Sequence, residues 1–155
     1  MKSKYSFIIY LILIIGSCTK DQGESDSLFD AHKRLTIFFV NDQHGQLDNF
    51  AKIKHIVDEE RKSTGVLLVC GGDIFSGNPV VDNHRQKGYP TIDVMNSPGF
   101  DVSVLGNHEF DYGEDVLGER IIQSEFDWIC ANIDVSKSDF PGIASYITLS
   151  VDDRR

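Results

Sequence analysis

The sequence has 155 residues, of which 41% are hydrophobic and 25% are charged; this balance indicates one globular domain and excludes a disordered or fibrous chain. The formal net charge of -9, from 24 acidic and 15 basic side chains, argues against nucleic-acid binding, because most of the surface would repel a phosphate backbone. A few bound cations can reverse the local field, so an acidic protein can still bind a small phosphate ester through metal-ligating carboxylates.

The N-terminus has the layout of a secretory signal. Lys2 and Lys4 precede an apolar run from Phe7 to Ile15. This run is shorter than the about 20 apolar residues of a membrane-spanning helix. The small residues before Cys18 resemble a bacterial lipoprotein processing site, at which Cys18 would be lipidated and become the mature N-terminus. An ordinary cleaved signal peptide, with Cys18 incidental, is the alternative.

These features predict three segments. Residues 1–17 are expected to be a lipoprotein signal peptide. Residues 18–33 are polar and are expected to form a flexible tether. Residues 34–155 are expected to belong to one globular domain, which the lipid would anchor to a membrane of the cell envelope.

Strands and helices are predicted to alternate along this domain. Apolar and β-branched runs that end in polar turns indicate strands, and apolar residues at helical spacing indicate helices. In chain order we expect a strand over 35–40, a helix over 49–62, a strand over 66–70, a short helix around Ile92 and Met95, a strand over 102–105, a helix over 116–122, and strands over 128–131 and 146–151. The alternation predicts an α/β fold of βαβ units, with a parallel sheet buried on both faces.

Metal-capable side chains follow three of the predicted strands. Asp42 and His44 are two residues apart, a spacing that points both to one side of an extended chain; Asp73 follows two glycines; Asn107 and His108 follow the third strand. Each group alone is better explained by a turn, a loop or a helix cap. Because ligands gather beyond the carboxyl ends of the strands in open α/β sheets, their joint occurrence predicts a metal site there.

Three blocks of the sequence resemble, in order, the motifs of the calcineurin-like metallophosphoesterases. They are Asn41-Asp42-Gln43-His44-Gly45, Gly71-Gly72-Asp73-Ile74-Phe75-Ser76-Gly77 and Gly106-Asn107-His108-Glu109-Phe110-Asp111-Tyr112-Gly113. The Phe-Asp-Tyr-Gly extension, with Cys130-Ala131-Asn132-Ile133 further on, is similar to the 5'-nucleotidase branch of that family in particular. The resemblance implies the family's layered βαβ sandwich, of which this chain would supply the N-terminal half.

The resemblance also implies roles for single residues. Asp42 and His44 would hold the first of two divalent cations, Asp73 would bridge both, and Asn107 would bind the second. His108 would be catalytic. Asp111 would orient the imidazole of His108 and keep it protonated, unless it is only a helix N-cap. Zinc, manganese, iron and magnesium all suit these ligands.

The implied activity is hydrolysis of nucleoside 5'-monophosphates or related nucleotides in the cell envelope. The family completes its metal site with histidines further along the chain, and a separate domain reads the nucleoside, but no histidine follows Asp111 in this sequence. The chain is therefore expected to lack the C-terminal half of the catalytic domain and to leave apolar sheet surface uncovered. The alternative is a surface lipoprotein fragment that is catalytically incomplete and has no turnover.

Overall fold

A computed structural model describes residues 34–139, 141 and 143–151. The predicted signal peptide, the tether and the lipidation site at Cys18 lie outside these residues. Within the described ranges, no helix has the length and apolar character needed to cross a membrane.

Four parallel strands form one sheet, in which strands that follow each other in the chain lie side by side. The strands are β1 (Leu35–Val40), β2 (Gly65–Cys70), β3 (Val102–Val104) and β4 (Asp127–Ile129). β1 and β2 pair along their whole lengths, and β3 and β4 are shorter. The predicted α/β class with a parallel sheet is therefore confirmed.

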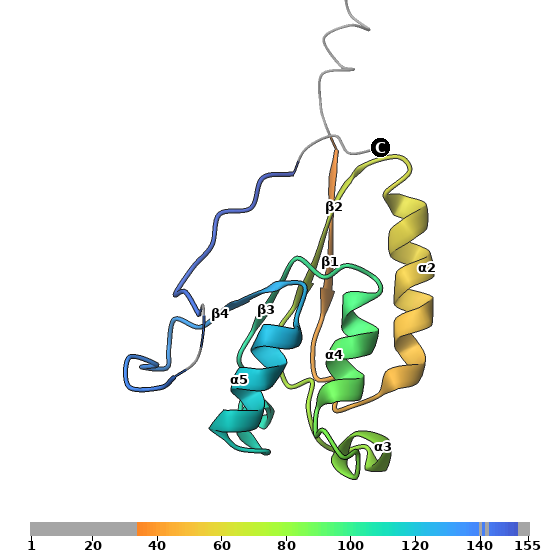
Figure 1. The fold of residues 1–155 in the computed structure, drawn as a ribbon. Coiled ribbons are helices and arrows are strands. Elements are labelled where there is room, and N and C mark those ends of the chain that lie inside the picture. The colour runs from red at the N-terminus through yellow and green to blue at the C-terminus, as the bar shows by residue number, and fades with distance from the viewer. Residues whose placement is uncertain (1–33, 140, 142, 152–155) are drawn as a thin grey trace, which may run out of the picture. The chain divides into compact units, whose positions relative to one another are not determined.

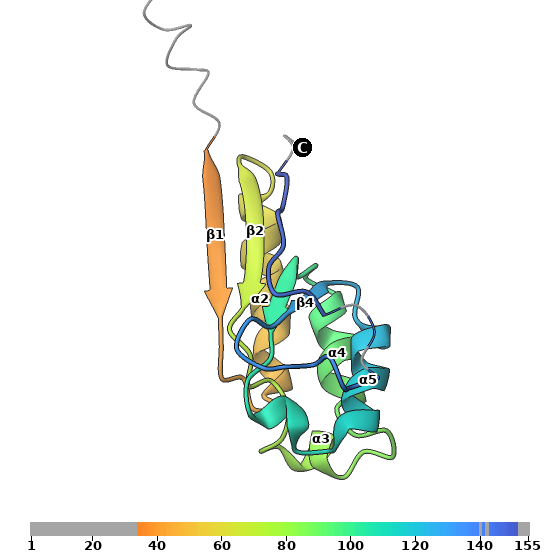
Figure 2. The ribbon, with the colours of Figure 1, turned by 90° about the vertical axis from the view of Figure 1, so that its left-hand side faces the viewer.

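Helices connect the strands and pack on one face of the sheet (Figures 1 and 2). The longer helices are α2 (Phe50–Glu60), α4 (Tyr89–Asn96) and α5 (Glu114–Gln123), and the short ones are η1 (Leu47–Asn49), α3 (Pro79–Asp82) and η2 (His108–Phe110). Their apolar sides and the sheet enclose one core, whose fully buried side chains include Val57, Leu68, Ile92, Met95 and Leu117.

The opposite face of the sheet is largely open in the described part of the chain, so the expectation of burial on both faces was wrong. Side chains of β1 alternate in exposure. Leu35, Ile37 and Phe39 are 49%, 58% and 66% exposed, whereas Phe38 and Val40 pack against the core. The expectation that apolar sheet surface would be left uncovered is confirmed.

The predicted strand over residues 146–151 is also wrong. This segment has no strand pairing and lies on the open side of the sheet (Figures 1 and 2). Its approach to β2 is close, because a Cβ on Gly65 would meet a methyl carbon of Val151 at 2.7 Å. The nearest regular pairing is a single bridge between Ala144 and Ile129.

The carboxyl ends of the strands meet at one edge of the sheet, because all the strands run in the same direction. The loops over residues 41–46, 71–78 and 105–113 leave β1, β2 and β3 at this edge. All the predicted metal and catalytic residues lie in these loops, so the topology brings them to the place where ligands bind in open α/β sheets.

Candidate functional site

The backbone of the first two loops is strained at the candidate residues. Among the residues that the structure describes, the non-glycine residues with a positive φ are Asp42 (51°), His44 (45°), Asp73 (54°) and Ser76 (53°). A left-handed backbone costs a non-glycine residue about 1 kcal/mol or more, and such strain gathers at functional sites. The first three residues are among the four metal ligands nominated from the sequence, whereas Ser76 was not nominated.

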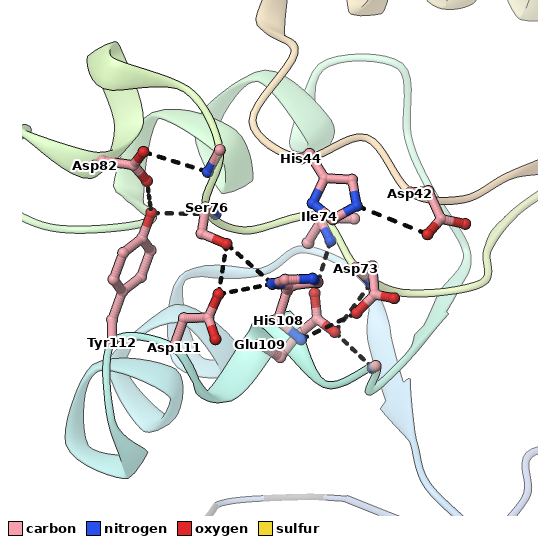
Figure 3. Close-up of polar contacts among 12 residues, drawn as sticks. Asp42, His44, Asp73, Ile74, Ser76, Asp82, His108, Glu109, Asp111 and Tyr112 are labelled. Carbon is pink, nitrogen blue, oxygen red and sulfur yellow. Dashed lines mark hydrogen bonds and ion pairs between the residues drawn. The ribbon is translucent and has the colours of Figure 1, made fainter.

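The loop after β1 lies alongside the loop after β2. The backbone amides of Asp42 and His44 donate hydrogen bonds to the carbonyls of Gly72 and Asp73, both at 3.1 Å. The chain turns here, because Asp42 and His44 both have a positive φ. The expectation that an extended backbone aligns the two side chains was therefore wrong. The side chains still meet, with Nε2 of His44 3.7 Å from Oδ1 of Asp42 (Figure 3). The side-chain amide of Asn41 donates a hydrogen bond to the other carboxylate oxygen of Asp42, Oδ2.

Asp73 lies where the loops after β2 and β3 touch. Its Oδ1 accepts a hydrogen bond from the backbone amide of His108 at 3.0 Å. A Cβ on Gly106 would lie 2.3 Å from this oxygen, and a Cβ on Gly72, whose φ is 87°, would lie 2.7 Å from the Gly106 nitrogen. Glycine is therefore required at both positions for the two loops to come this close.

Glu109 ties the same two loops together from beneath the site. Its side chain is fully buried and accepts hydrogen bonds from the backbone amides of Asp73 at 3.1 Å, Ile74 at 2.8 Å and Gly106 at 2.5 Å. Burial raises the pKa of Glu109, against the three amides that lower it. Glu109 therefore has a structural role, because it holds the loops after β2 and β3 together.

His108 and Asp111 form a pair at η2. Nδ1 of His108 lies 2.7 Å from Oδ2 of Asp111, and this hydrogen bond is the main cause that raises the pKa of His108. The pKa of Asp111 is lowered, first by a hydrogen bond from Ser76 and then by the one from His108. The rings of His108 and His44 have centroids 4.6 Å apart. Gly113, not Asp111, is the N-cap of α5, so the capping alternative for Asp111 was wrong.

Three residues of this network were missed by the sequence analysis. Ser76 donates from Oγ to Oδ2 of Asp111 at 2.5 Å. The Tyr112 hydroxyl accepts a hydrogen bond from the Ser76 amide at 3.1 Å and donates one to Asp82 (Figure 3). Ser76 and Tyr112 lie inside the family motifs, and this position in the sequence was the signal that could have identified them. Asp82 lies outside the motifs, and no sequence signal pointed to it.

The structure brings together Asp42, His44, Asp73 and His108. Asn107 directly precedes η2, and its side chain is exposed. Among the described residues, no three His, Cys, Asp or Glu side chains converge closely enough to form a metal-binding group. The nominated ligands therefore meet at one edge of the sheet but do not by themselves enclose a cation.

Comparison with known proteins places these observations in a family. Residues 35–149 match the family described as calcineurin-like phosphoesterase. A 2',3'-cyclic-nucleotide 2'-phosphodiesterase/3'-nucleotidase of Haemophilus influenzae is 30% identical over 126 residues, which are 76% of this chain and 19% of that protein. A 5'-nucleotidase of Vibrio vulnificus is 35% identical over 116 residues, which are 67% of this chain and 21% of that protein. The chain thus spans about a fifth of the length of these relatives.

Solved structures share the fold. A 5'-nucleotidase precursor from Thermus thermophilus matches with a TM-score of 0.69 over 77% of this chain and 26% of that chain, at 24% sequence identity. The match to the family covers most of the residues that the structure describes, including all three strand-end loops. The chain belongs to the calcineurin-like phosphoesterase family.

Proposed function

We propose that the protein carrying this sequence hydrolyses phosphate esters of nucleotides, nucleoside 5'-monophosphates above all, with two divalent cations. The observation that carries the proposal is the meeting of side chains from three successive strand ends: Asp42 and His44 after β1, Asp73 after β2 and His108 after β3 (Figure 3). Carboxylates and imidazoles at this edge of a parallel sheet suit divalent cations and phosphate together.

In this proposal Asp42 and His44 hold the first cation, Asp73 lies between the two, and Asn107 offers its amide oxygen to the second. The 3.7 Å approach of His44 to Asp42 supports the first assignment. Oxygen and nitrogen donors of this kind accept zinc, manganese, iron or magnesium. Bound cations would neutralise charge on the phosphoryl oxygens and lower the pKa of an attacking water. Four side chains are few for two cations, so water or further ligands would complete the coordination.

His108 is the group that acts on the leaving ester oxygen. Its hydrogen bond to Asp111 raises the pKa of the imidazole and thereby favours the protonated ring. With Nδ1 engaged by Asp111, the other ring nitrogen, Nε2, is left to stabilise charge on the ester oxygen or to protonate it as the bond to phosphorus breaks. The leaving alcohol then carries that proton, and the water oxygen remains on phosphorus.

Nucleotides are the favoured substrate class because the relatives are named for them. The Haemophilus protein is named for a cyclic-nucleotide phosphodiesterase and a 3'-nucleotidase, and the Vibrio protein for a 5'-nucleotidase. A cell-envelope location, with a lipid on Cys18, belongs to the same proposal. It is supported by Lys2 and Lys4 before the apolar run from Phe7 to Ile15.

The second candidate is a lipoprotein fragment without turnover. It is favoured by one observation, which is that the described residues contain no converging group of three metal-ligating carboxylate, imidazole or thiolate side chains. Such a chain would bind cations weakly and leave phosphate esters intact.

Hydrolysis of AMP, 2',3'-cyclic AMP and p-nitrophenyl phosphate by the protein at its full natural length, with and without Mn²⁺, tests the proposal. We expect AMP hydrolysis that needs Mn²⁺, stops on chelation, and falls by about 100-fold or more in Asp73→Asn. Asp58→Asn is the matched control, because Asp58 lies on α2 in an ion pair with Lys54. Turnover that survives chelation or Asp73→Asn would contradict the metal assignment. No turnover of any of the three esters would favour the second candidate.

A further inference from the structure

Ser76 lies in the loop after β2, and its hydroxyl reaches the residues that follow β3. Its Oγ donates to Oδ2 of Asp111 at 2.5 Å and lies 3.2 Å from Nδ1 of His108. Because Nδ1 and Oδ2 are 2.7 Å apart, the three atoms form a closed triangle of polar contacts (Figure 3). Ser76 thus contacts both members of the His108–Asp111 pair.

The His108–Asp111 pair is not held by packing alone. The side chains of His108 and Asp111 are 35% and 39% exposed, and the two residues lie only three positions apart in the chain. Partly exposed side chains keep one orientation only where hydrogen bonds hold them, because rotamer freedom otherwise favours several. Ser76 supplies such a bond from a different loop, the one that also carries Asp73.

The backbone of Ser76 is itself held in its left-handed conformation. The Ser76 amide donates to the hydroxyl of Tyr112 at 3.1 Å, and that hydroxyl donates to Asp82. Asp82 also accepts a hydrogen bond from the next amide, that of Gly77, at 3.2 Å. Two side chains from α3 and from the residues after η2 therefore maintain the strained φ of 53° with which Ser76 reaches Asp111.

We propose that Ser76 is a positioning residue for phosphoester hydrolysis. Its hydroxyl, kept in place by Tyr112 and Asp82, fixes the carboxylate of Asp111 and through it the imidazole of His108. The proposal rests on the proposed function, in which a water oxygen bonds to phosphorus, the bond from phosphorus to the ester oxygen breaks, and that oxygen takes the Nε2 proton of His108. A misaligned imidazole slows this transfer while substrate binding is retained.

Two substitutions of Ser76, in the full-length protein with Mn²⁺, test the role of the hydroxyl. Ser76→Ala removes it, and Ser76→Gly removes it while accepting a φ of 53° without strain. For both we expect kcat with AMP to fall by about 10- to 100-fold and KM to change little. The loss with p-nitrophenyl phosphate should be smaller, because its phenolate leaves with less need of a proton. Ser63→Ala, at an exposed serine after α2, is the control and should keep parental values.

Parental kcat with AMP in both variants would overturn the proposal. So would equal losses for the two esters together with a raised KM, because this is the result expected if Ser76 only maintains the loop. A fall in Ser76→Ala that Ser76→Gly does not share would assign the effect to backbone strain and would also overturn it.

Nitrogen NMR of His108, in the protein without added metal, keeps this inference separate from the proposed function. We expect the proton on Nδ1 of the parent to be protected from exchange with water, and both Ser76 variants to exchange it faster. If the parent does not hydrolyse AMP but the variants change this signal, the proposed function fails while the positioning of His108 by Ser76 stands. An unchanged signal in both variants overturns the positioning even in an active protein.

Discussion

At the scale of single residues, Asp111 controls the proton affinity of His108. Their hydrogen bond of 2.7 Å raises the pKa of His108 above its ordinary value of 6.5. We predict that Asp111→Asn lowers this pKa, because a neutral amide stabilises the imidazolium less than a carboxylate does. NMR titration of the His108 ring protons measures this pKa. Asp115→Asn, which replaces an exposed aspartate, is the control. A pKa unchanged by Asp111→Asn would show that another group is responsible.

The same shift fixes how the His108–Asp111 pair contributes to stability as the pH changes. The pKa of His108 is higher in the folded chain than its ordinary value. The contribution of His108 is therefore fully present below pH 6.5 and is lost as the pH rises through the raised pKa. The contribution of Asp111, whose pKa is lowered, is present above its ordinary value of 3.8 and is lost as the pH falls through the lowered pKa.

Glu109 gives a second prediction at this scale. Its fully buried carboxylate accepts hydrogen bonds from three backbone amides. Glu109→Ala would leave these amides without a partner, and each buried unsatisfied group costs about 1–3 kcal/mol. We expect a loss of about 3 kcal/mol or more in the free energy of unfolding, measured by urea denaturation. Glu109→Gln keeps one acceptor oxygen, so its free energy of unfolding should fall less. Glu125→Ala, at an exposed position, should change the free energy of unfolding little. A loss in Glu109→Ala no larger than in Glu125→Ala would contradict the prediction.

Asp42, His44 and Asp73 could be nominated from the sequence because metal-capable side chains directly follow apolar, β-branched runs, which a local pattern reveals. Ser76 could not. Its role depends on a positive φ and on Tyr112, which is 36 positions away. Even for Asp42 and His44 the expected backbone was wrong, since the pattern of alternation does not reveal that the chain turns at both residues.

At the scale of elements, α2 is fastened to the turn before β3 by Arg61. Its guanidinium donates to the carbonyls of Pro98 at 2.6 Å and Gly99 at 2.7 Å. Lysine cannot make this forked contact, so Arg61→Lys should lower the free energy of unfolding by about 1–3 kcal/mol. The neighbouring Lys62 forms an exposed ion pair with Glu59, and Lys62→Ala should change the free energy of unfolding by less than about 1 kcal/mol. Equal urea midpoints for the two variants would contradict this account.

The sequence predicted most elements because their apolar periodicity is strong, and it failed where tertiary contacts decide. Residues 146–151 alternate weakly, as a strand would, but no neighbouring strand pairs with them in the described part of the chain. Helix α3 is only four residues long, too short for a periodic pattern. It begins because the side chain of Asn78 accepts the Val80 amide and Pro79 occupies the first turn.

At the scale of the whole molecule, one layer of helices and one sheet suffice to bring the site residues together. The core between helices and sheet fixes the strand ends, and three loops at one edge supply every nominated ligand. The open face of β1, with Leu35, Ile37 and Phe39 exposed, contributes nothing to this arrangement. Site geometry and surface coverage are therefore separate properties of the chain: the first is present among the described residues, and the second is not.

The last prediction follows from that separation. The 155-residue chain alone should hydrolyse p-nitrophenyl phosphate with Mn²⁺ hardly above the rate without protein, because Asp42, His44, Asp73 and Asn107 offer two cations too few ligands for tight binding. Mn²⁺ titration followed by calorimetry should accordingly show weak binding, further weakened by Asp73→Asn but not by Asp58→Asn. Robust, chelator-sensitive turnover by this chain would contradict the prediction, since it would mean that these four side chains and water hold both cations well enough for catalysis.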